Sequence, residues 1–369
     1  MPNLNLKNFA KIKDSDFDIK DITVFAGKPG SGKSYVMKTL YAIYEAPNKV
    51  KDEAQLLSKQ LDIINNKFPN IDEINPNKLN NNELKELKKI INEFQKLDIT
   101  KMVNSKHFYD LYKNILTSIF GNINQISNNF IINYEDVILD YSKDKLVTNL
   151  KDDKLFIKSE SNIFVETPLI LEFKKFMNRE EGKTPYHIES LLKILDKDYS
   201  FTDEEQDEFI KSFVEKSKSI INGSIEDSGD SFVYKTDKQD FDIINASSGI
   251  KSIGLLQYLV TNKALKKGSI LFWEEPEVHL HPTWQLKMID LFVELMDAGV
   301  KVIFSTHSPF MTDYLNAKSK KENFRNKVSF NLLNEENGIV KNTILDDNSW
   351  DKLQSELLDP LEEVMWEYI

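Results

Sequence analysis

The stretch that decides the fold is ITVFAGKPGSGKSYVM, residues 22–37. Its first five residues form an apolar run that is typical of a β-strand buried on both faces. The next eight, residues 27–34, fit the spacing G-x-x-x-x-G-K-[ST]. Apolar residues then recur at helical spacing at Val36, Met37, Leu40, Ile43 and Tyr44. This order of strand, glycine-rich loop and helix predicts a phosphate-binding site.

The loop itself predicts how phosphate groups are held. Glycines let backbone N–H groups approach the phosphates without a Cβ in the way, and the helix N-terminus adds its dipole. We expect Lys33 to neutralise the β- and γ-phosphate oxygens, and Ser34 to hold Mg²⁺ through its hydroxyl. The expected nucleotide-binding residues are Gly27, Lys28, Pro29, Gly30, Ser31, Gly32, Lys33 and Ser34. The alternative, an ordinary glycine turn, is disfavoured by the flanking strand and helix.

Two further apolar strands end in reactive side chains. Residues 269–273 are followed directly by Glu274 and Glu275, and residues 302–305 are followed by Thr306 and His307. Ligands of open α/β sheets bind at the carboxyl ends of the strands, so these side chains should meet the loop. Glu274 is predicted to belong to the Mg²⁺ site. Glu275 is predicted to polarise the attacking water, and His307 to contact the γ-phosphate. Taken singly, the acids fit a solvated strand end and the histidine fits a core position.

A fourth segment, residues 245–251, reads NASSGIK and places small and hydroxyl residues where a helix begins. Such a helix N-terminus can bind an anion. The plainer interpretation is an N-capped helix, with Ser247 or Ser248 as the capping residue. Both interpretations are left open by this segment alone.

The rest of the chain predicts an α/β protein. A strand is expected over residues 4–9, and helices over 57–68, 84–94, 106–120, 188–195 and 204–221. Short strands of an antiparallel sheet are expected at 130–132, 146–147, 155–157 and 163–165, and a strand pair at 232–234 and 241–244. Alternation then follows, with helices at 250–260 and 282–298 and strands at 269–273 and 300–305, which implies a parallel sheet. The last helix, 349–369, is interrupted by Pro360.

These elements suggest three parts. Residues 1–48 and 225–369 are expected to form one head domain from two separate pieces of sequence. Residues 49–127 form a helical insertion, in which 57–68 and 84–94 fold into a hairpin too short for a sustained coiled coil. Residues 128–224 form an antiparallel β stretch and a helical lobe that leads to residues 245–251.

Composition excludes several classes of protein. The chain has 369 residues, of which 40% are apolar and 29% charged, as in globular proteins. It has no cysteine, which excludes a disulfide scaffold, a cysteine zinc site and a thiol nucleophile. No apolar run reaches the ~18 residues of a membrane span, and the N-terminus does not resemble a signal peptide, so we expect a cytoplasmic protein without membrane partners. A net charge of −11 argues against a general nucleic-acid binder, although a local basic face stays open.

The four segments together, in this order, resemble the ABC-type ATPase heads of the SMC and recombination-repair class. The resemblance is strongest to OLD-type ATPases and related bacterial AAA-family ATPases of anti-phage defence. Residues 274–282, EEPEVHLHP, resemble the Walker B and D-loop signature of that branch, and residues 305–309 its H-loop. Residues 247–249 resemble the signature motif that contacts ATP from the opposite subunit. The chain departs from the family in having Glu274 where Asp is frequent.

The resemblance implies an ABC ATPase head, a P-loop fold with a mostly parallel sheet, an antiparallel β subdomain and an inserted helical hairpin. It implies hydrolysis of ATP with Mg²⁺ in a homodimer, or higher assembly, that encloses two ATP molecules. Ser247, Ser248 and Gly249 of one chain would complete the site of the other. The residues after Pro309 are too few for the nuclease domain fused to many OLD-type relatives. We therefore expect a dimeric switch that controls a separately encoded effector, in the setting of anti-phage defence.

Three other functions stay open from the sequence. A DNA-repair or chromosome-structure ATPase would bind DNA directly, through a long coiled-coil arm or a basic stripe. A transporter ATPase subunit is disfavoured by the insertion before residue 247 and by the EPEVHLHP segment. A scaffold that binds ATP without hydrolysis is disfavoured by Glu275.

Overall fold

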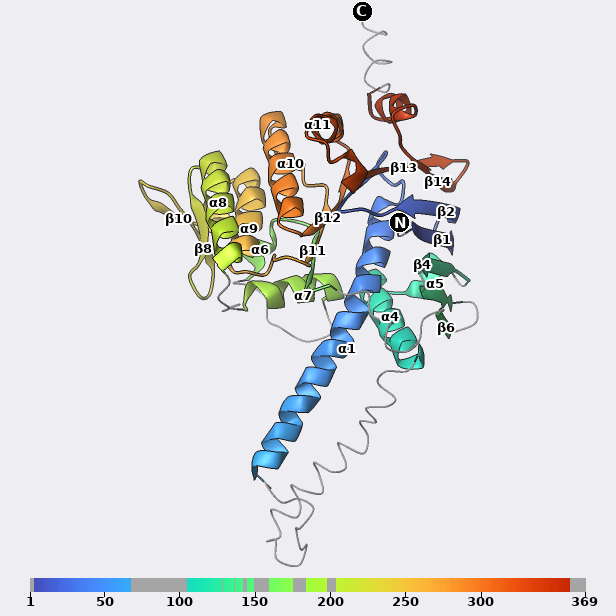
Figure 1. The fold of residues 1–369 in the computed structure, drawn as a ribbon, viewed down its shortest axis with the longest axis horizontal. Coiled ribbons are helices and arrows are strands. Elements are labelled where there is room, and N and C mark those ends of the chain that lie inside the picture. The colour runs from blue at the N-terminus through green and yellow to red at the C-terminus, as the bar shows by residue number, and fades with distance from the viewer. Residues whose placement is uncertain are drawn as a thin grey trace, which may run out of the picture.

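The computed structural model describes residues 3–67, 105–127, 129–135, 137–141, 145–148, 159–174, 184–197 and 204–358. Within them, eleven strands form one sheet in the order β6-β5-β4-β1-β2-β14-β13-β3-β12-β11-β7, and three form a second sheet, β10-β9-β8 (Figure 1). The strands of the large sheet are β1 (Asn3–Phe9), β2 (Ile12–Asp18), β3 (Ile22–Ala26), β4 (Ile131–Tyr134), β5 (Val137–Asp140), β6 (Lys145–Thr148), β7 (Asn162–Val165), β11 (Ile270–Glu274), β12 (Lys301–Thr306), β13 (Val328–Glu336) and β14 (Ile339–Ile344). Those of the small sheet are β8 (Ser224–Asp227), β9 (Phe232–Lys235) and β10 (Asp240–Asp242).

Helices cover both faces of the large sheet. They are α1 (Lys33–Lys67), α4 (Ser105–Phe120), α5 (Ile123–Ile126), α6 (Ile170–Phe173), α7 (Tyr186–Leu195), α8 (Glu204–Ile221), α9 (Ser248–Thr261), α10 (Pro282–Asp297) and α11 (Pro309–Lys321), with short 3₁₀ turns η5 (Ile243–Asn245) and η6 (Arg325–Lys327). Residues 350–358 are also helical, which agrees with the first half of the predicted 349–369 helix, and Pro360 lies outside the described residues. None of the described helices is long and apolar enough to cross a membrane.

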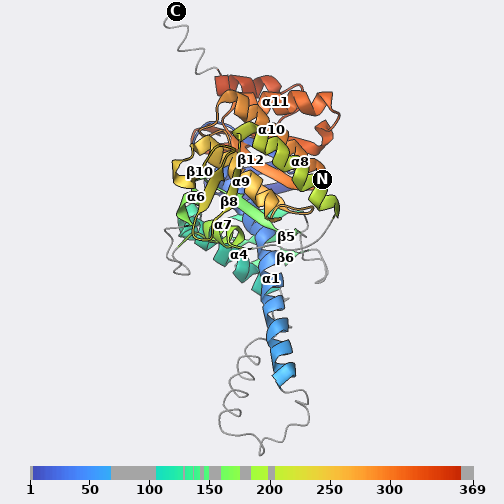
Figure 2. The same cartoon turned by 90° about the vertical axis from the view of Figure 1, so that its left-hand side faces the viewer.

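The centre of the large sheet is parallel, as predicted. Strands β13, β3, β12, β11 and β7 all run in the same direction, and every residue of β3 is buried. Side chains alternate between two hydrophobic cores, so that Val302 and Phe304 enter one and Ile303 the other. The first core lies under α8, α9, α10 and α11, and the second under α1 and α4 (Figure 2). All five carboxyl ends therefore meet at one edge of the sheet.

The prediction of an antiparallel sheet over residues 130–165 is right for one part and wrong for another. Strands β4, β5 and β6 are antiparallel and extend the large sheet through β1. Strand β7 instead pairs in parallel with β11, so that Ile163 lies opposite Leu271. Its four residues are all buried, which is the pattern of a parallel strand covered on both faces. The predicted strand 155–157 lies outside the described residues.

The first predicted helix of the insertion is part of a longer one. Helix α1 has 35 residues and continues through Pro47, and Figure 1 shows it extending away from the sheet. Proline removes a backbone hydrogen bond and usually ends a helix. Here Ala46 and Val50 are buried on either side, so packing in the second core holds the helix through the proline. The predicted helix 84–94 lies outside the described residues.

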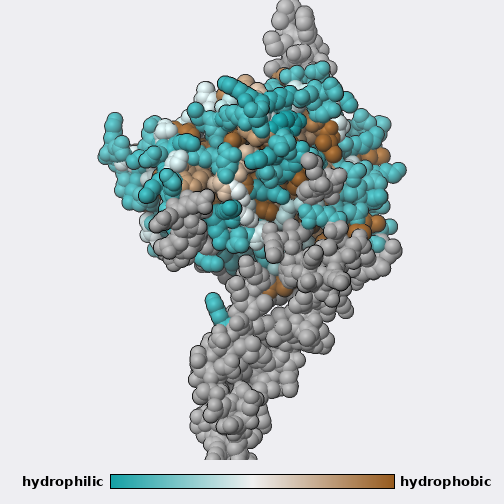
Figure 3. All heavy atoms as spheres, viewed as in Figure 1, coloured by the Kyte–Doolittle hydropathy of each residue, from teal (hydrophilic) through white to brown (hydrophobic). Residues whose placement is uncertain are grey.

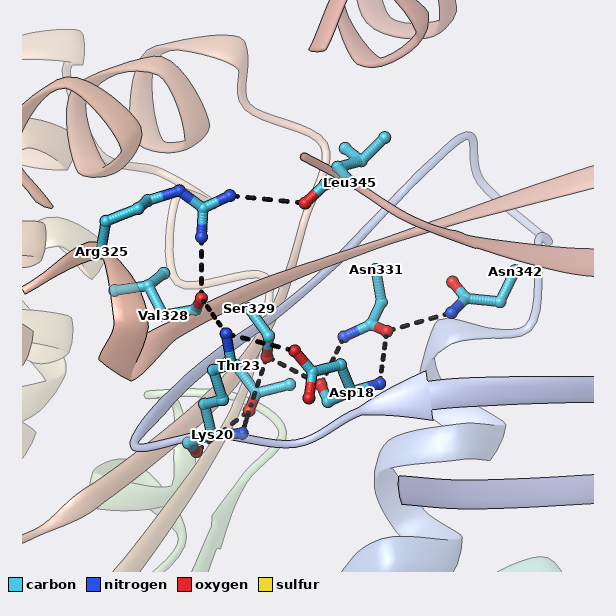
Figure 4. Close-up of polar contacts among 9 residues, drawn as sticks. All are labelled: Asp18, Lys20, Thr23, Arg325, Val328, Ser329, Asn331, Asn342 and Leu345. Carbon is cyan, nitrogen blue, oxygen red and sulfur yellow. Dashed lines mark hydrogen bonds and ion pairs between the residues drawn. The ribbon is translucent and has the colours of Figure 1, made fainter. Parts of the chain in front are cut away.

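A buried polar network joins the N-terminal strands to the C-terminal ones (Figure 4). Strand β2 pairs with β14 through Ile12 and Val340 and then diverges from it. The fully buried Asn331 of β13 fills the gap, because its amide accepts from the N–H of Asp18 at 3.0 Å and donates to the Asp18 carbonyl at 2.9 Å. Asn342 of β14 donates to the same amide oxygen at 3.0 Å. Residues more than 300 positions apart are thus fixed in one sheet.

The described surface in Figure 3 is mainly hydrophilic, with small separate hydrophobic patches. The largest exposed apolar fractions belong to Phe310 at 54% and Phe173 at 45%. Scattered exposed apolar residues of this kind are normal in globular proteins.

Candidate functional site

The glycine-rich loop lies between the end of β3 and the start of α1. Gly27 has a φ of +138°, and a Cβ at this position would lie 2.3 Å from the carbonyl oxygen of Leu333 in β13. Only glycine fits there, because a side chain would collide with backbone that cannot move aside. The N–H of Ser31 donates to the Lys28 carbonyl at 3.2 Å, which closes the turn before the helix begins.

Lys33 points back into this loop. Its Nζ donates to the carbonyls of Gly27 at 2.9 Å and Lys28 at 3.0 Å, and the side chain is buried. Burial lowers the pKa of Lys33 to about 8, and the nearby charges of Glu275, Glu277 and Glu274 oppose that shift. The ammonium group thus lies inside the loop with carboxylates facing it, at the position expected for a phosphate-binding lysine.

Glu274 ends β11 beside the first turn of α1. Among the described residues its buried carboxylate oxygen Oε1 has no hydrogen-bond partner, and the nearby hydroxyl of Ser34 favours the ionised form of the carboxyl. Burial raises the pKa of Glu274, and the charge of Lys38 opposes this shift. A hydroxyl and an unpartnered carboxylate oxygen are ligands that Mg²⁺ prefers, so the residues fit this metal. In the described ranges no three histidine, aspartate or glutamate side chains form a cluster that could hold a metal ion, so phosphate oxygens and water would have to complete the coordination.

Glu275 and His307 meet between the two strand ends. In the sheet β12 lies between β3 and β11, with Thr306 opposite Ala26 and Ser305 opposite Glu274. His307 Nε2 lies 3.1 Å from Glu275 Oε1, and the ring is close enough to the loop for Gly27 and Lys33 to affect its pKa. Burial lowers the pKa of His307, and the charge of Lys33 adds to this shift. The structure therefore brings together the loop, both predicted glutamates and the predicted histidine.

Glu277 belongs to this site but was given no role from the sequence. Its Oε1 accepts a hydrogen bond from the N–H of His307 at 2.6 Å, so it fixes the segment that carries the histidine. Burial raises the pKa of Glu277. The sequence signal was its place in the EPEVHLHP segment, where Glu275 has a φ of +46° and turns the chain back toward β12.

A second group missed from the sequence surrounds Glu166, which follows β7. Its carboxylate accepts from Lys38 Nζ at 2.9 Å and lies 2.6 Å from His187 Nε2. These contacts, led by the one with His187, lower the pKa of Glu166 to about 2. Lys38 lies one helical turn after Ser34, so this group supports the part of the site that contains Ser34 and Glu274, from α1 and α7. Treating residues 163–165 as a buried parallel strand would have revealed it, because Glu166 then follows Val165 as Glu274 follows the paired Trp273 in β11.

Residues 247–249 lie at the N-terminus of α9. Ser247 is exposed and caps the helix, since its side chain accepts from the N–H of Ile250 at 3.4 Å. Gly249 is buried, and a Cβ there would lie 3.3 Å from the His279 carbonyl oxygen. In the part of the chain that the structure describes, no hydrogen bond or ion pair joins residues 247–249 to residues 27–34. The structure therefore does not bring the predicted signature segment to the loop of its own chain.

The two histidines of the EPEVHLHP segment differ in their surroundings. His281 caps α10, because its Nδ1 accepts from the N–H of Thr283 at 3.3 Å. His279 is exposed and has a φ of +65°. Helix capping accounts for the position of the His281 ring, so no metal ion is needed to explain it.

The AAA ATPase domain model matches residues 1–312. The chain belongs to the AAA ATPase domain family. The match spans the glycine-rich loop, the strand ends with Glu275 and His307, and the signature segment, so the ATPase class expected from the resemblance is confirmed.

Comparison with solved structures finds remote likenesses. The SMC head domain from Thermotoga maritima has a TM-score of 0.46 and 11% identity, over 93% of this chain and 98% of that chain. An Smc head domain with an extended coiled coil, bound to the C-terminal domain of ScpA derived from Pyrococcus furiosus, has a TM-score of 0.43 and 12% identity, over 97% and 100%. An ATP-binding cassette of an ABC transporter has a TM-score of 0.38 and 13% identity, over 98% and 96%. A search of curated proteins finds no match.

Proposed function

We propose that this AAA-family chain binds ATP with Mg²⁺ and hydrolyses it. The observation that carries the proposal is the contact of His307 Nε2 with Glu275 Oε1 at 3.1 Å, directly beside the loop that holds Lys33. A carboxylate held by a histidine next to a phosphate loop is suited to orienting a water molecule against a terminal phosphate.

Each residue of the site then has a distinct task. The loop N–H groups and Lys33 bind the phosphates, and Ser34 and Glu274 would hold Mg²⁺. The bound ion would neutralise charge on the β- and γ-phosphate oxygens. Glu275 polarises the attacking water, and His307 contacts the γ-phosphate. Glu277 holds His307 in place through the backbone N–H.

We further propose that two copies pair head to tail around two ATP molecules. Support comes from the N-terminus of α9, where Ser247 is exposed and where, among the described residues, no hydrogen bond or ion pair leads to the loop of the same chain. This helix end could therefore bind the nucleotide of a second copy. Val278 is 40% exposed and Phe310 is 54% exposed, and they lie three residues after Glu275 and His307, respectively. A second copy docked on this edge would cover both side chains.

In this proposal ATP closes the pair, hydrolysis opens it, and a separately encoded effector detects which state is present. Anti-phage defence is the setting suggested by the family resemblance of residues 274–282. The effector should bind preferentially to the closed state. Proteins that co-purify with a hydrolysis-deficient variant in ATP, and not in ADP, would identify it.

The test of hydrolysis is the Glu275→Gln variant. Loss of the catalytic carboxylate should lower turnover about 100-fold or more while ATP still binds, because general bases typically contribute 10²–10⁴-fold. The exposed Glu336→Gln is the matched control and should turn over ATP at the wild-type rate. Normal phosphate release by the Glu275→Gln variant would remove Glu275 from the mechanism. A wild-type protein that binds ATP without releasing phosphate would instead be a scaffold.

A further inference from the structure

An aromatic pair, the exposed Tyr35 and the partly buried Phe120, lies beside the glycine-rich loop and has no role in the site described so far. Tyr35 follows Ser34 in the first turn of α1, and its side chain is 40% exposed. Its ring stacks on Phe120, the last residue of α4, with centroids 5.2 Å apart and planes at 11°. Both rings also meet the edge of the buried Phe9, at 6.4 Å and 6.0 Å.

The arrangement of the sheet places this pair on the side of the loop away from the residues proposed to face the γ-phosphate. Glu275 and His307, the residues proposed to face the γ-phosphate, directly follow β11 and β12, on one side of β3. Strands β13, β14, β2 and β1 lie on the other side of β3. Tyr35 packs against Phe9 at the end of β1, so it lies on the side away from His307. A triphosphate that points its terminal phosphate at His307 extends its sugar and base toward Tyr35.

The surface chemistry of the pair suits a nucleobase. A backed, exposed aromatic ring presents a flat face that a base can cover, and such stacking is tolerant of base identity because every base has a π-face. Phe120 and Phe9 fix the tyrosine ring from behind and from the edge, so little side-chain freedom is lost on binding.

We propose that Tyr35, backed by Phe120, stacks on the base of the nucleotide whose phosphates the loop holds. The inference rests on the proposed nucleotide-binding function and extends it to the nucleoside. The pair joins α1 to α4, so the base contact would be shared between the loop helix and a helix that follows it by about 70 residues in the chain. Discrimination among bases through this contact should be weak.

The test compares ATP with ribose 5-triphosphate, which carries the same phosphates and sugar but no base. Tyr35→Ala should weaken ATP binding on the order of 10-fold or more, the usual effect of losing a base-stacking ring, and leave the affinity for ribose 5-triphosphate unchanged. Tyr35→Phe keeps the ring and should bind ATP like the wild type. Phe173→Ala removes an equally exposed aromatic elsewhere and is the matched control. Calorimetry in the presence of Mg²⁺ measures the affinity of each of the four proteins for both ligands.

The outcomes separate this inference from the proposed function. If the wild type binds neither ligand, the proposed function fails. If it binds ATP and the Tyr35→Ala variant binds ATP equally well, the stacking role fails while the loop assignment stands. If Tyr35→Ala does not fold, the wild-type protein alone tests the stacking role. Equal wild-type affinities for ATP and ribose 5-triphosphate would exclude any contact with the base. A Tyr35→Ala variant that loses self-association but keeps its ATP affinity also overturns the proposal.

Discussion

Lys33 shows how a single residue is prepared for its ligand. Its ammonium group is buried among loop carbonyls, and burial lowers the pKa of Lys33 to about 8. The group is therefore desolvated, and the nearby carboxylates only partly compensate for this. A phosphate group supplies the missing negative charge. Lys33→Ala should therefore weaken ATP binding on the order of 100-fold, at the upper end of what a hydrogen bond to a charged group contributes.

Calorimetric titration with ATP and Mg²⁺ checks the Lys33 prediction. Lys211→Ala is the matched control, because that lysine is exposed on α8, and its affinity should equal that of the wild type. An unchanged affinity in Lys33→Ala would contradict the role of the loop.

At this scale the sequence predicts residues whose spacing is local. The loop spacing and the acids that end β11 could be located because each lies within a few residues of its own strand. Glu277 and Glu166 could not, since their importance comes from contacts made across the sheet, at His307 and Lys38 respectively. The contacts of these two carboxylates can be predicted only once the order of the parallel strands is known.

At the scale of elements, Glu166 joins β7 to α1 and α7. The pKa of its carboxyl is lowered from an ordinary value of 4.5 to about 2. Because the folded pKa lies below the unfolded one, the ionised carboxylate stabilises the fold above pH 4.5, and this contribution disappears as the pH falls from 4.5 to 2. Glu166→Gln should lower the free energy of unfolding at pH 7 by about 1 kcal/mol, the scale of a partly exposed ion pair.

Urea denaturation at pH 7 and at successively lower pH checks the Glu166 prediction. The difference between Glu166→Gln and the wild type should shrink as the solution becomes more acidic. Glu226→Gln, which changes an exposed acid on β8, should show no comparable loss at pH 7. A difference that does not change with pH would show that Glu166 acts through shape and not through its charge.

Periodicity predicted best the helices that bury one face and the strand that is buried on both faces. Strand β3 and helices α4, α8 and α10 fall close to their expected ranges. Helix α1 is longer than predicted because packing of Ala46 and Val50 overrides the proline between them. Strand β7 was assigned to the wrong kind of sheet, since the three-residue apolar run at 163–165 does not indicate which strand it pairs with.

At the scale of the whole molecule, the fold of one chain brings together all of the predicted site residues except those of the signature segment, residues 247–249. The N-terminus of α9 faces solvent at Ser247, and a second copy is the partner that would give this helix end a phosphate to contact. ATP should therefore convert monomers to dimers, most completely in the Glu275→Gln background, where the nucleotide persists. Ser247→Arg should prevent this dimer, because a long side chain would occupy the space between the helix and the partner's ATP.

Light scattering with and without ATP and Mg²⁺ checks the dimer prediction. Ser247→Asp is the more demanding variant, since it keeps a good helix cap but opposes the phosphate charge, and it should also stay monomeric. Ser219→Arg, on the exposed face of α8, should dimerise normally. If both Ser247 variants still form the ATP-dependent dimer, the two copies do not complete each other's sites, and Ser247 serves only as the N-cap of α9.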